Sequence, residues 1–465
     1  MPVPHRLRRL LAAALPAIIV VALTACSNAQ YPNSVFHDHT EFNRDVGYLF
    51  KILLWLGTFV FIFVEGILLY TIVRYKRKNE NDRPAHVHGN TTLEILWTAI
   101  PAVILAFIAV PTVRTIFKTQ ATAAAGSLQV QVIGHQWWWE FRYPQYTTQG
   151  NGKLDTLTTA NELYLPIGRT VNFALTTQDV LHSFWIPQMG GKRDLITNRV
   201  NHLWFTPDSV GEGAWNGFCA EFCGASHGNM HFKTFTVTKA NFESWAAHQL
   251  SPAAFGAVAA APAAPAAPDT IKPVQVPSEA RTPGKTNQIA VTPTGTKGGA
   301  VTAVSAAQAP GHDMAAMNMP VQQAGFVSFP KEKLPAHTIP RTPIPDGMAF
   351  NESVHGDAER GRALLTAGQG GCLGCHVIRG NPMMVGQIGP NLTHIGSRTT
   401  IAAGIYPNDT KHLALWIKNA RAMKPGVVMP TLGKGQLDPV TKATMAMGLT
   451  DEQIADIVAY LQALK

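Results

Sequence analysis

Charged side chains are scarce in this chain. Asp, Glu, Lys and Arg make up 14% of its 465 residues, against about 25% in an ordinary soluble domain. Hydrophobic residues make up 46%. This deficit predicts membrane spans together with a charge-poor linker, and the length predicts more than one domain. The net charge of +9 does not indicate nucleic-acid binding, because part of it lies in an N-terminal signal and in a loop beside the membrane.

Cysteine is also scarce, with five in the whole chain. Cys219 and Cys223 open a cluster that continues with His227 and Met230, and His182, at a strand-like edge upstream, can supply a second imidazole. Thiolate, imidazole and thioether together select copper over hard ions such as magnesium or calcium. The alternatives are a Cys219–Cys223 disulfide and a mononuclear zinc or copper site.

A second pair of cysteines forms the pattern Cys372-Leu-Gly-Cys375-His376. This is the haem attachment pattern, in which two thiols add across the haem vinyl groups and the histidine binds the iron. A zinc knuckle would need a second ligand pair, and none is near. The remaining cysteine, Cys26, belongs to a processing site, so no cysteine is left over for a structural disulfide.

The first 25 residues read as a secretory signal peptide of the lipoprotein type. Arg6, Arg8 and Arg9 precede a short apolar run, residues 10–21, that is too short for a stable membrane span. Leu23-Thr24-Ala25-Cys26 resembles a bacterial lipobox, which implies cleavage before Cys26 and lipidation of its thiol. Ordinary signal cleavage nearby is the alternative. Either way, residues 26–47 lie outside the cytoplasm.

Residues 48–117 are predicted to form a transmembrane hairpin. Its two apolar segments, residues 48–73 and 93–117, are each long enough to cross a hydrocarbon core. The basic loop between them, residues 74–83, is placed in the cytoplasm by the positive-inside bias. Glu65 lies within the first segment and should face protein or water rather than lipid.

Residues 118–250 are predicted to form a β-sandwich. Residues 128–143, 162–185, 198–205 and 234–237 alternate apolar and polar side chains, which is typical of strands. Trp137, Trp138 and Trp139 are consecutive and cannot all be core, since successive strand residues face opposite ways. Together the strands suggest a cupredoxin-like sandwich with the copper ligands on loops at one end.

Residues 251–345 are rich in Ala, Pro, Thr and Gly, and predict a long disordered linker. His312, Met314, Met317 and Met319 within it resemble a weak copper-binding tract, but chance in a low-complexity linker is the favoured explanation. Residues 346–465 are predicted to form an all-α domain around the haem pattern. Its last segment, residues 449–464, begins with acidic residues and reads as a capped amphipathic helix.

The soft-ligand cluster resembles the binuclear copper centre, CuA, of subunit II of cytochrome c oxidases. That resemblance implies that Cys219 and Cys223 bridge two coppers and that His182 and His227 each bind one. Met230 and the backbone carbonyl of Glu221 are then the weak outer ligands. The Glu221 carboxylate is implied to reach a magnesium ion shared with subunit I.

Two further residues take roles from the same resemblance. Trp137, in Gly-His-Gln-Trp, matches the position where electrons enter from cytochrome c, and an exposed indole would suit such a contact. Glu94, at the start of the second span, matches the entrance of a proton channel. On its chemistry alone it is also a good helix-start residue.

The C-terminal part resembles class I cytochromes c. Gly389-Pro390-Asn391-Leu392 is similar to a loop of that family, and Met429 fits its Met-Pro signature for the sixth iron ligand. A methionine ligand raises the haem potential relative to two histidines. The rival ligands are Met383, Met384, Met423, Met445, Met447 and His394.

The whole pattern resembles subunit II of a caa3-type cytochrome c oxidase that carries its own fused cytochrome c. The implied cofactors are CuA, covalent haem c and magnesium. The implied partners are subunit I, the other oxidase subunits and an upstream donor complex or cytochrome c. The implied location is the bacterial inner membrane, with both redox domains on its outer face.

Two other functions remain open on the sequence. One is the CuA subunit of a nitric-oxide-reducing haem–copper enzyme, against which Glu94 argues. The other is a non-enzymatic copper-handling protein, which would not explain the haem pattern. A quinol oxidase subunit is disfavoured because such subunits lack the copper ligands present here.

Overall fold

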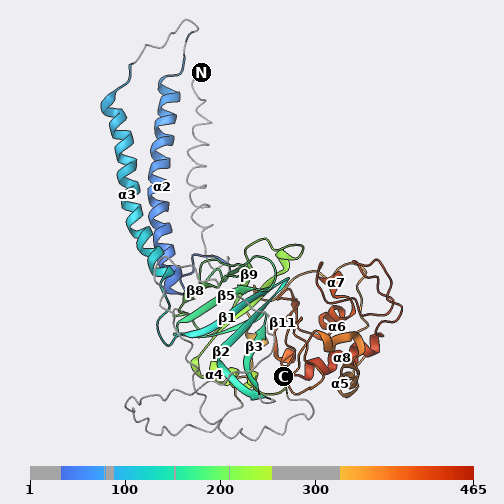
Figure 1. Cartoon of the computed structure of the whole chain (residues 1–465). Coiled ribbons are helices and arrows are strands. Elements are labelled where there is room, and N and C mark those ends of the chain that lie inside the picture. The colour runs from blue at the N-terminus through green and yellow to red at the C-terminus, as the bar shows by residue number, and fades with distance from the viewer. Residues whose placement is uncertain (1–32, 78, 80–87, 151–152, 209, 254–324) are drawn as a thin grey trace, which may run out of the picture.

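The computed structural model describes residues 33–77, 79, 88–150, 153–208, 210–253 and 325–465. They form a two-helix hairpin, a β-sandwich at the foot of the hairpin and a mainly helical C-terminal domain beside the sandwich (Figure 1). This arrangement confirms the predicted fold class. Cys26, the tract at residues 312–319 and most of the predicted linker lie outside the described residues.

The hairpin consists of α2 (Glu41–Arg74) and α3 (Thr91–Gln120). Both helices are long and apolar enough to cross a membrane. Each extends several residues beyond its predicted apolar segment, because capped polar turns continue the helix past the hydrocarbon-facing part. Pro101 and Pro111 lie inside α3 without ending it.

The foot of the hairpin is bonded to the sandwich. The Thr40 hydroxyl caps α2 by accepting from the Asn43 amide, and it donates to the Met189 carbonyl at 2.5 Å. After α3 ends, the Trp204 indole donates to the carbonyl of Ala121 at 2.8 Å. These contacts fix how the sandwich sits on the membrane side of the molecule.

The sandwich has two five-stranded sheets, in the orders β3-β2-β1-β5-β8 and β4-β10-β9-β6-β7. The β1–β5 and β4–β10 pairs are parallel and the other pairs are antiparallel. The strands are β1 (Leu128–His135), β2 (Trp138–Gly150), β3 (Lys153–Ala160), β4 (Glu162–Pro166), β5 (Val171–Thr177), β6 (His182–Trp185), β7 (Arg193–Leu195), β8 (Asn201–Phe205), β9 (Gly213–Cys219) and β10 (His231–Val237).

Aromatic side chains fill the space between the two sheets. The Phe232 ring lies 5.0 Å from Phe184 and 5.5 Å from both Trp139 and Phe141, and all four are fully buried. Helix α4 (Lys239–Leu250) closes the end of the sandwich with the buried ring of Trp245. The period-two pattern of the sequence produces this core because alternate strand residues face the same side.

The C-terminal domain is built from α5 (Ala358–Thr366), α6 (Thr410–Lys418), α7 (Ala420–Met423) and α8 (Asp451–Ala463). A two-stranded pair, β11 (Thr400–Ile401) with β12 (Tyr406–Pro407), is added to them. Helices α5 and α8 cross closely at Gly361, where a β-carbon would lie 2.0 Å from the Asp456 carbonyl oxygen. A capping box at Thr450 and Gln453 begins α8, as its sequence predicts.

Phe326, Phe329 and Leu334, near the end of the predicted linker, pack on the sandwich. The Phe329 amide donates to the Tyr164 hydroxyl at 3.0 Å, and its ring lies 5.2 Å from Phe235. Phe329 is 4% exposed and belongs to the sandwich core. The chain therefore contacts the β-sandwich again before it enters the C-terminal domain.

The C-terminal domain also contacts the sandwich directly. The Glu162 carboxylate of β4 is buried and accepts from the amide and the hydroxyl of Thr399, each at 2.7 Å. Arg379 pairs with Asp155 of β3 at 2.7 Å. His394 Nε2 donates to the Ser251 carbonyl at 3.1 Å. These bonds hold the two domains in one orientation.

Gly217, in β9, leaves room for the core ring of Phe232. A β-carbon at Gly217 would lie 2.1 Å from Phe232 Cζ, so Gly217→Ala must displace that ring. We expect it to lower the free energy of unfolding by about 1–3 kcal/mol. Gly211→Ala, where nothing lies within 4 Å, should change it by less than about 0.5 kcal/mol. Denaturant unfolding of the purified chain measures both, and equal effects would contradict this packing.

Acid should weaken the domain contact at His394. Burial, with repulsion from His248, lowers the pKa of His394 to about 4 from an ordinary value of 6.5. The docked state therefore favours neutral imidazole, and stability is lost as pH falls from about 6.5 to about 4, by at most about 3 kcal/mol. Burial raises the pKa of Glu162 and so acts in the opposite direction.

The variant His394→Gln separates the effect of His394 on domain docking from that of Glu162. Amide hydrogen exchange at Thr399 and Thr400, corrected for the intrinsic pH dependence of exchange, measures docking. Wild type should lose more protection than His394→Gln between pH 6.5 and 4, and equal losses would show that His394 does not contribute.

Candidate metal centres

The copper-motif loop connects two paired strands. Cys219 ends β9 and His231 begins β10, and Phe218 is paired with His231 in the antiparallel ladder. On its other side β9 pairs with β6, where Phe184 is opposite Cys219. His182, at the start of β6, is thereby brought to the same end of the sheet as the loop.

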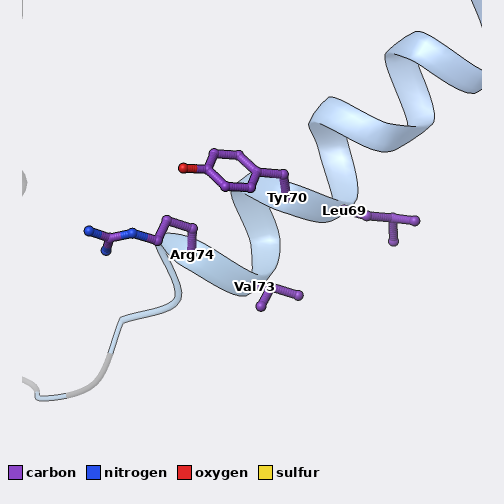
Figure 2. A pocket seen from close by; sticks show the side chains of 4 residues that line it. All are labelled: Leu69, Tyr70, Val73 and Arg74. Carbon is purple, nitrogen blue, oxygen red and sulfur yellow. The ribbon is translucent and has the colours of Figure 1, made fainter.

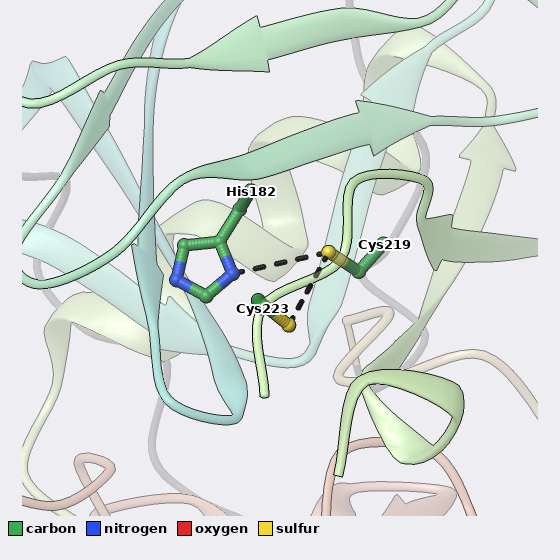
Figure 3. Close-up of side chains that lie close together, drawn as sticks. All are labelled: His182, Cys219 and Cys223. Carbon is green, nitrogen blue, oxygen red and sulfur yellow. Dashed lines mark hydrogen bonds between the residues drawn. The ribbon is translucent and has the colours of Figure 1, made fainter. Parts of the chain in front are cut away.

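The two cysteines and His182 lie together at this end of the sheet (Figure 3). The sulfur atoms of Cys219 and Cys223 are 3.8 Å apart, and His182 Nδ1 is 3.8 Å from the Cys219 sulfur. The four described cysteines form no disulfide with one another. The predicted distant histidine therefore reaches the thiol pair.

The remaining predicted ligands surround the same sulfur pair. His227 Nδ1 lies 3.5 Å and the Met230 sulfur 3.8 Å from the Cys223 sulfur. The Glu221 carbonyl oxygen lies 3.3 Å from the Cys219 sulfur, while the Glu221 side chain is exposed. All six donors named from the sequence thus converge.

The chemistry of these donors fits copper. Two sulfurs, two imidazole nitrogens and a thioether are a soft set, and no carboxylate oxygen is within it. The Cys223 thiol and the His182 imidazole lower the pKa of Cys219. The nearby Cys219 thiolate, with burial, raises the pKa of Cys223. One of the two thiols, that of Cys219, therefore ionises readily. A bound cation would favour loss of the proton from the other thiol, that of Cys223.

Asp179 is a functional residue that the sequence analysis did not name. Its carboxylate accepts from His182 Nε2 at 2.8 Å and from the Gln136 amide at 2.6 Å. The Asp179–His182 bond fixes the tautomer of His182 and leaves Nδ1 facing the Cys219 sulfur. This is a common arrangement for metal-binding histidines. Burial opposes charge on His182, but the bonds with Asp179 and Cys219 raise its pKa overall. The three-residue spacing from Asp179 to His182 was the available signal.

Trp137 is bonded to the copper loop. Its indole Nε1 donates to the Cys223 carbonyl at 2.9 Å, and Gln136 Nε2 donates to the same oxygen at 2.8 Å. Trp137 is 8% exposed, because the C-terminal domain covers it, so it lies against another domain rather than on an open surface. Trp139 is in the core, and Trp138 is half-buried and stacks on His135 at 4.1 Å.

The haem pattern begins in a short 3-10 segment, η4 (Gln369–Gly374), that follows α5; Cys375 caps this segment and His376 comes next. His376 Nδ1 donates to the Pro390 carbonyl at 2.8 Å, so Nε2 is the nitrogen left to bind iron. Burial lowers the pKa of His376 and keeps the ring neutral. Gly389 permits this approach, since a β-carbon there would lie 2.6 Å from His376 Cε1. The residues present therefore fit a covalently held haem.

Met429 and its rivals lie in different surroundings. Met429 is half-buried and packs against the same cluster as Cys372. Met384 and Met423 are buried in the domain core, and Met447 is 98% exposed. His394 uses Nε2 to contact Ser251 of the other domain. Met429 keeps its place as the predicted sixth ligand.

Glu94 lies far from both metal motifs, in the first turn of α3, which Asn90 caps. This turn is at the end of the hairpin remote from the sandwich (Figure 1). A hollow at the same end of α2 is lined by Leu69, Tyr70, Val73 and Arg74 (Figure 2). Apolar side chains with a terminal tyrosine and arginine are typical of a membrane boundary.

Three protein families match consecutive parts of the chain. Residues 37–115 match the transmembrane domain of cytochrome c oxidase subunit II, and residues 128–237 match the periplasmic domain of the same subunit. Residues 358–465 match cytochrome c. The two helices and the matched periplasmic domain make this a membrane protein with a domain outside the cytoplasm.

Individual proteins show the same similarity. Cytochrome c oxidase subunit 2 of Alkalihalophilus pseudofirmus is 26% identical over 87% of this chain and 83% of that protein. The probable cytochrome c oxidase subunit 2 of Rickettsia bellii is 34% identical over 44% of this chain and 79% of that protein.

A solved structure is also similar. It is the periplasmic domain of subunit II of cytochrome oxidase from Bradyrhizobium japonicum, 28% identical over 27% of this chain and 95% of that chain, with a TM-score of 0.23. On the matched families and the relatives together, this chain belongs to the cytochrome c oxidase subunit II family, a haem–copper oxidase subunit, and carries a cytochrome c domain at its C-terminal end.

Proposed function

We propose that the chain is subunit II of a caa3-type cytochrome c oxidase. In this role it passes electrons from the haem of its own cytochrome c domain to a CuA centre, and from there to the haem–copper site of subunit I for oxygen reduction coupled to proton translocation. The observation that carries the proposal is the convergence of five sulfur and imidazole donors and the Glu221 carbonyl at the copper loop, whose Cys223 carbonyl accepts from the Trp137 indole.

The copper pair would be held by Cys219, Cys223, His182 and His227, with Met230 and the Glu221 carbonyl as outer ligands. Bound there, it accepts and releases one electron shared over two metal ions. Asp179 orients His182 toward the sulfur pair. The paired strands β6 and β9 hold His182 and Cys219 in place. His182, Cys219, Cys223 and Met230 are buried, which limits their movement and their contact with water.

The haem would be held covalently by Cys372 and Cys375, with His376 and Met429 as axial ligands. Bound there, it supplies one-electron chemistry at a potential raised by the methionine. The Pro390 carbonyl orients His376. Because both domains lie in one chain, the haem domain stays at high effective concentration beside the copper loop.

The other assignments concern the partners. Glu94, at the cytoplasmic end of α3, is proposed to stand at the proton entrance into subunit I. The exposed Glu221 carboxylate is proposed to help bind magnesium at the subunit I boundary. The donor is an upstream complex or a cytochrome c. The chain is proposed to reside in the bacterial inner membrane with both redox domains on the outer face, and Cys26 to be lipidated.

Metal analysis and electron paramagnetic resonance (EPR) of the purified chain test this function. We expect two coppers and one covalent haem per chain, and a signal from an electron shared by both coppers. A single metal ion in the sandwich domain, or a chain without covalent haem, would contradict the proposal.

Cys219→Ser removes one of the two bridging sulfurs. We expect the shared-copper EPR signal to be lost while the haem absorption spectrum is unchanged, since the haem domain has its own core. Ala220→Ser is the matched control, because it adds a hydroxyl to the adjacent position and removes no donor. Persistence of the shared signal in Cys219→Ser would refute the bridging role.

Met429→Leu removes the proposed sixth ligand with little change in volume. We expect the absorption band of methionine-bound ferric haem to disappear and the haem potential to fall. Met423→Leu makes the same change at a buried core position and should leave the band in place. If Met423→Leu abolished the band and Met429→Leu did not, the assignment of Met429 would be wrong.

A further inference from the structure

We propose that Lys424 and Gly426 are positioning residues that seat the haem domain on the Trp137 ring. The inference rests on the proposed function, because it concerns how the haem domain is placed beside the copper loop. Both residues lie just before Met429, in the segment Lys424-Pro425-Gly426-Val427-Val428-Met429 that follows α7.

Lys424 joins the two domains through its side chain. It is 1% exposed, and its Nζ donates to the Trp137 carbonyl at 2.7 Å and to the Ala402 carbonyl at 3.2 Å. Burying an ammonium group is costly unless hydrogen bonds compensate for the lost water. One of the two carbonyls belongs to the sandwich, so the ammonium is satisfied in this way only while the domains are docked. The buried Lys424 ammonium therefore favours one docked position of the two domains over other orientations.

Gly426 contacts the ring itself. A β-carbon at Gly426 would lie 2.6 Å from Cη2 and Cζ3 of Trp137 and 3.3 Å from the Ala225 β-carbon. No side chain fits there, so the backbone of the haem domain lies directly against the edge of the indole. Its φ of +87° is also a conformation that favours glycine.

The residue between them adds a third contact. The Pro425 carbonyl accepts from the Ser226 hydroxyl at 2.5 Å, and Ser226 lies on the copper loop itself, next to His227. Val427, which follows Gly426, packs against the sandwich core. Four consecutive residues of the haem domain thus contact Trp137, the copper loop or the sandwich beneath them.

These contacts form a continuous link between the two metal motifs. The segment that carries Met429 lies on Trp137, whose indole is bonded to the Cys223 carbonyl. With 8% of Trp137 exposed, a free protein cannot contact the ring while the haem domain is seated. Glu162 and Thr399 form a separate anchor, so loss of the Gly426 contact should displace this segment without releasing the whole domain.

A pair of glycine substitutions tests the inference. Gly426→Ala forces a methyl group into the Trp137 ring. Gly435→Ala is the matched control: its φ is +76°, so the backbone strain is similar, but nothing lies within 4 Å of the added carbon. Lys424→Met keeps an unbranched side chain one atom shorter and removes both hydrogen bonds, which gives a second, independent variant.

Amide hydrogen exchange of the full chain measures seating without relying on electron transfer. Gly426→Ala and Lys424→Met should raise exchange in residues 136–139 and 424–428, while Thr399 stays protected. Gly435→Ala should match wild type in these segments. Equal exchange in Gly426→Ala and Gly435→Ala would overturn the inference.

The second measurement is the rate of haem-to-copper electron transfer after photoreduction of the haem in the assembled oxidase. Gly426→Ala and Lys424→Met should be slower than Gly435→Ala by about tenfold or more, with haem and copper spectra and midpoint potentials unchanged. Equal rates would overturn the inference. If wild type itself transfers no electron between the two centres, the proposed function fails, whereas the exchange contrast still decides whether Lys424 and Gly426 seat the domain.

Discussion

The pairing of β9 with both of its neighbours is the constraint on which the copper-motif site depends. One ladder sets Cys219 opposite Phe184 and so beside His182, and the other sets the loop between Phe218 and His231. Since a shift of one residue would turn every side chain to the opposite face, either ladder in another register would separate the donors. The buried Phe232 ring and the space left by Gly217 keep this register. The fold therefore determines the site through ordinary core packing.

Much of this could be predicted from the sequence, because the signals were local. The two apolar helices, the period-two strands and the C-x-x-C-H pattern each follow from spacing along the chain. His182 was included because the motif resemblance required a second imidazole, and the structure brings it to the sulfur pair. Asp179 was missed because a single aspartate three residues before a histidine is common. Only the observed bond from Nε2 distinguishes it.

The domain interface could not be predicted, because its parts lie far apart in sequence. Glu162 meets Thr399 across 237 residues, and Lys424 meets Trp137 across 287. No periodicity marks such residues, and Lys424 in a Lys-Pro-Gly turn reads as an ordinary surface residue. The burial of Trp137 could not be predicted for the same reason: the residues that cover it belong to another domain. The fused domain thus covers the Trp137 ring.

A pair of coppers held by the Cys219–Cys223 loop is the central claim. X-ray absorption at the copper edge tests it most directly, because it reports the atoms around each copper. The account predicts copper scattering from a second copper at short distance, with two sulfur and one or more nitrogen neighbours from Cys219, Cys223, His182 and His227. A spectrum with sulfur and nitrogen neighbours but no copper–copper contribution would contradict it.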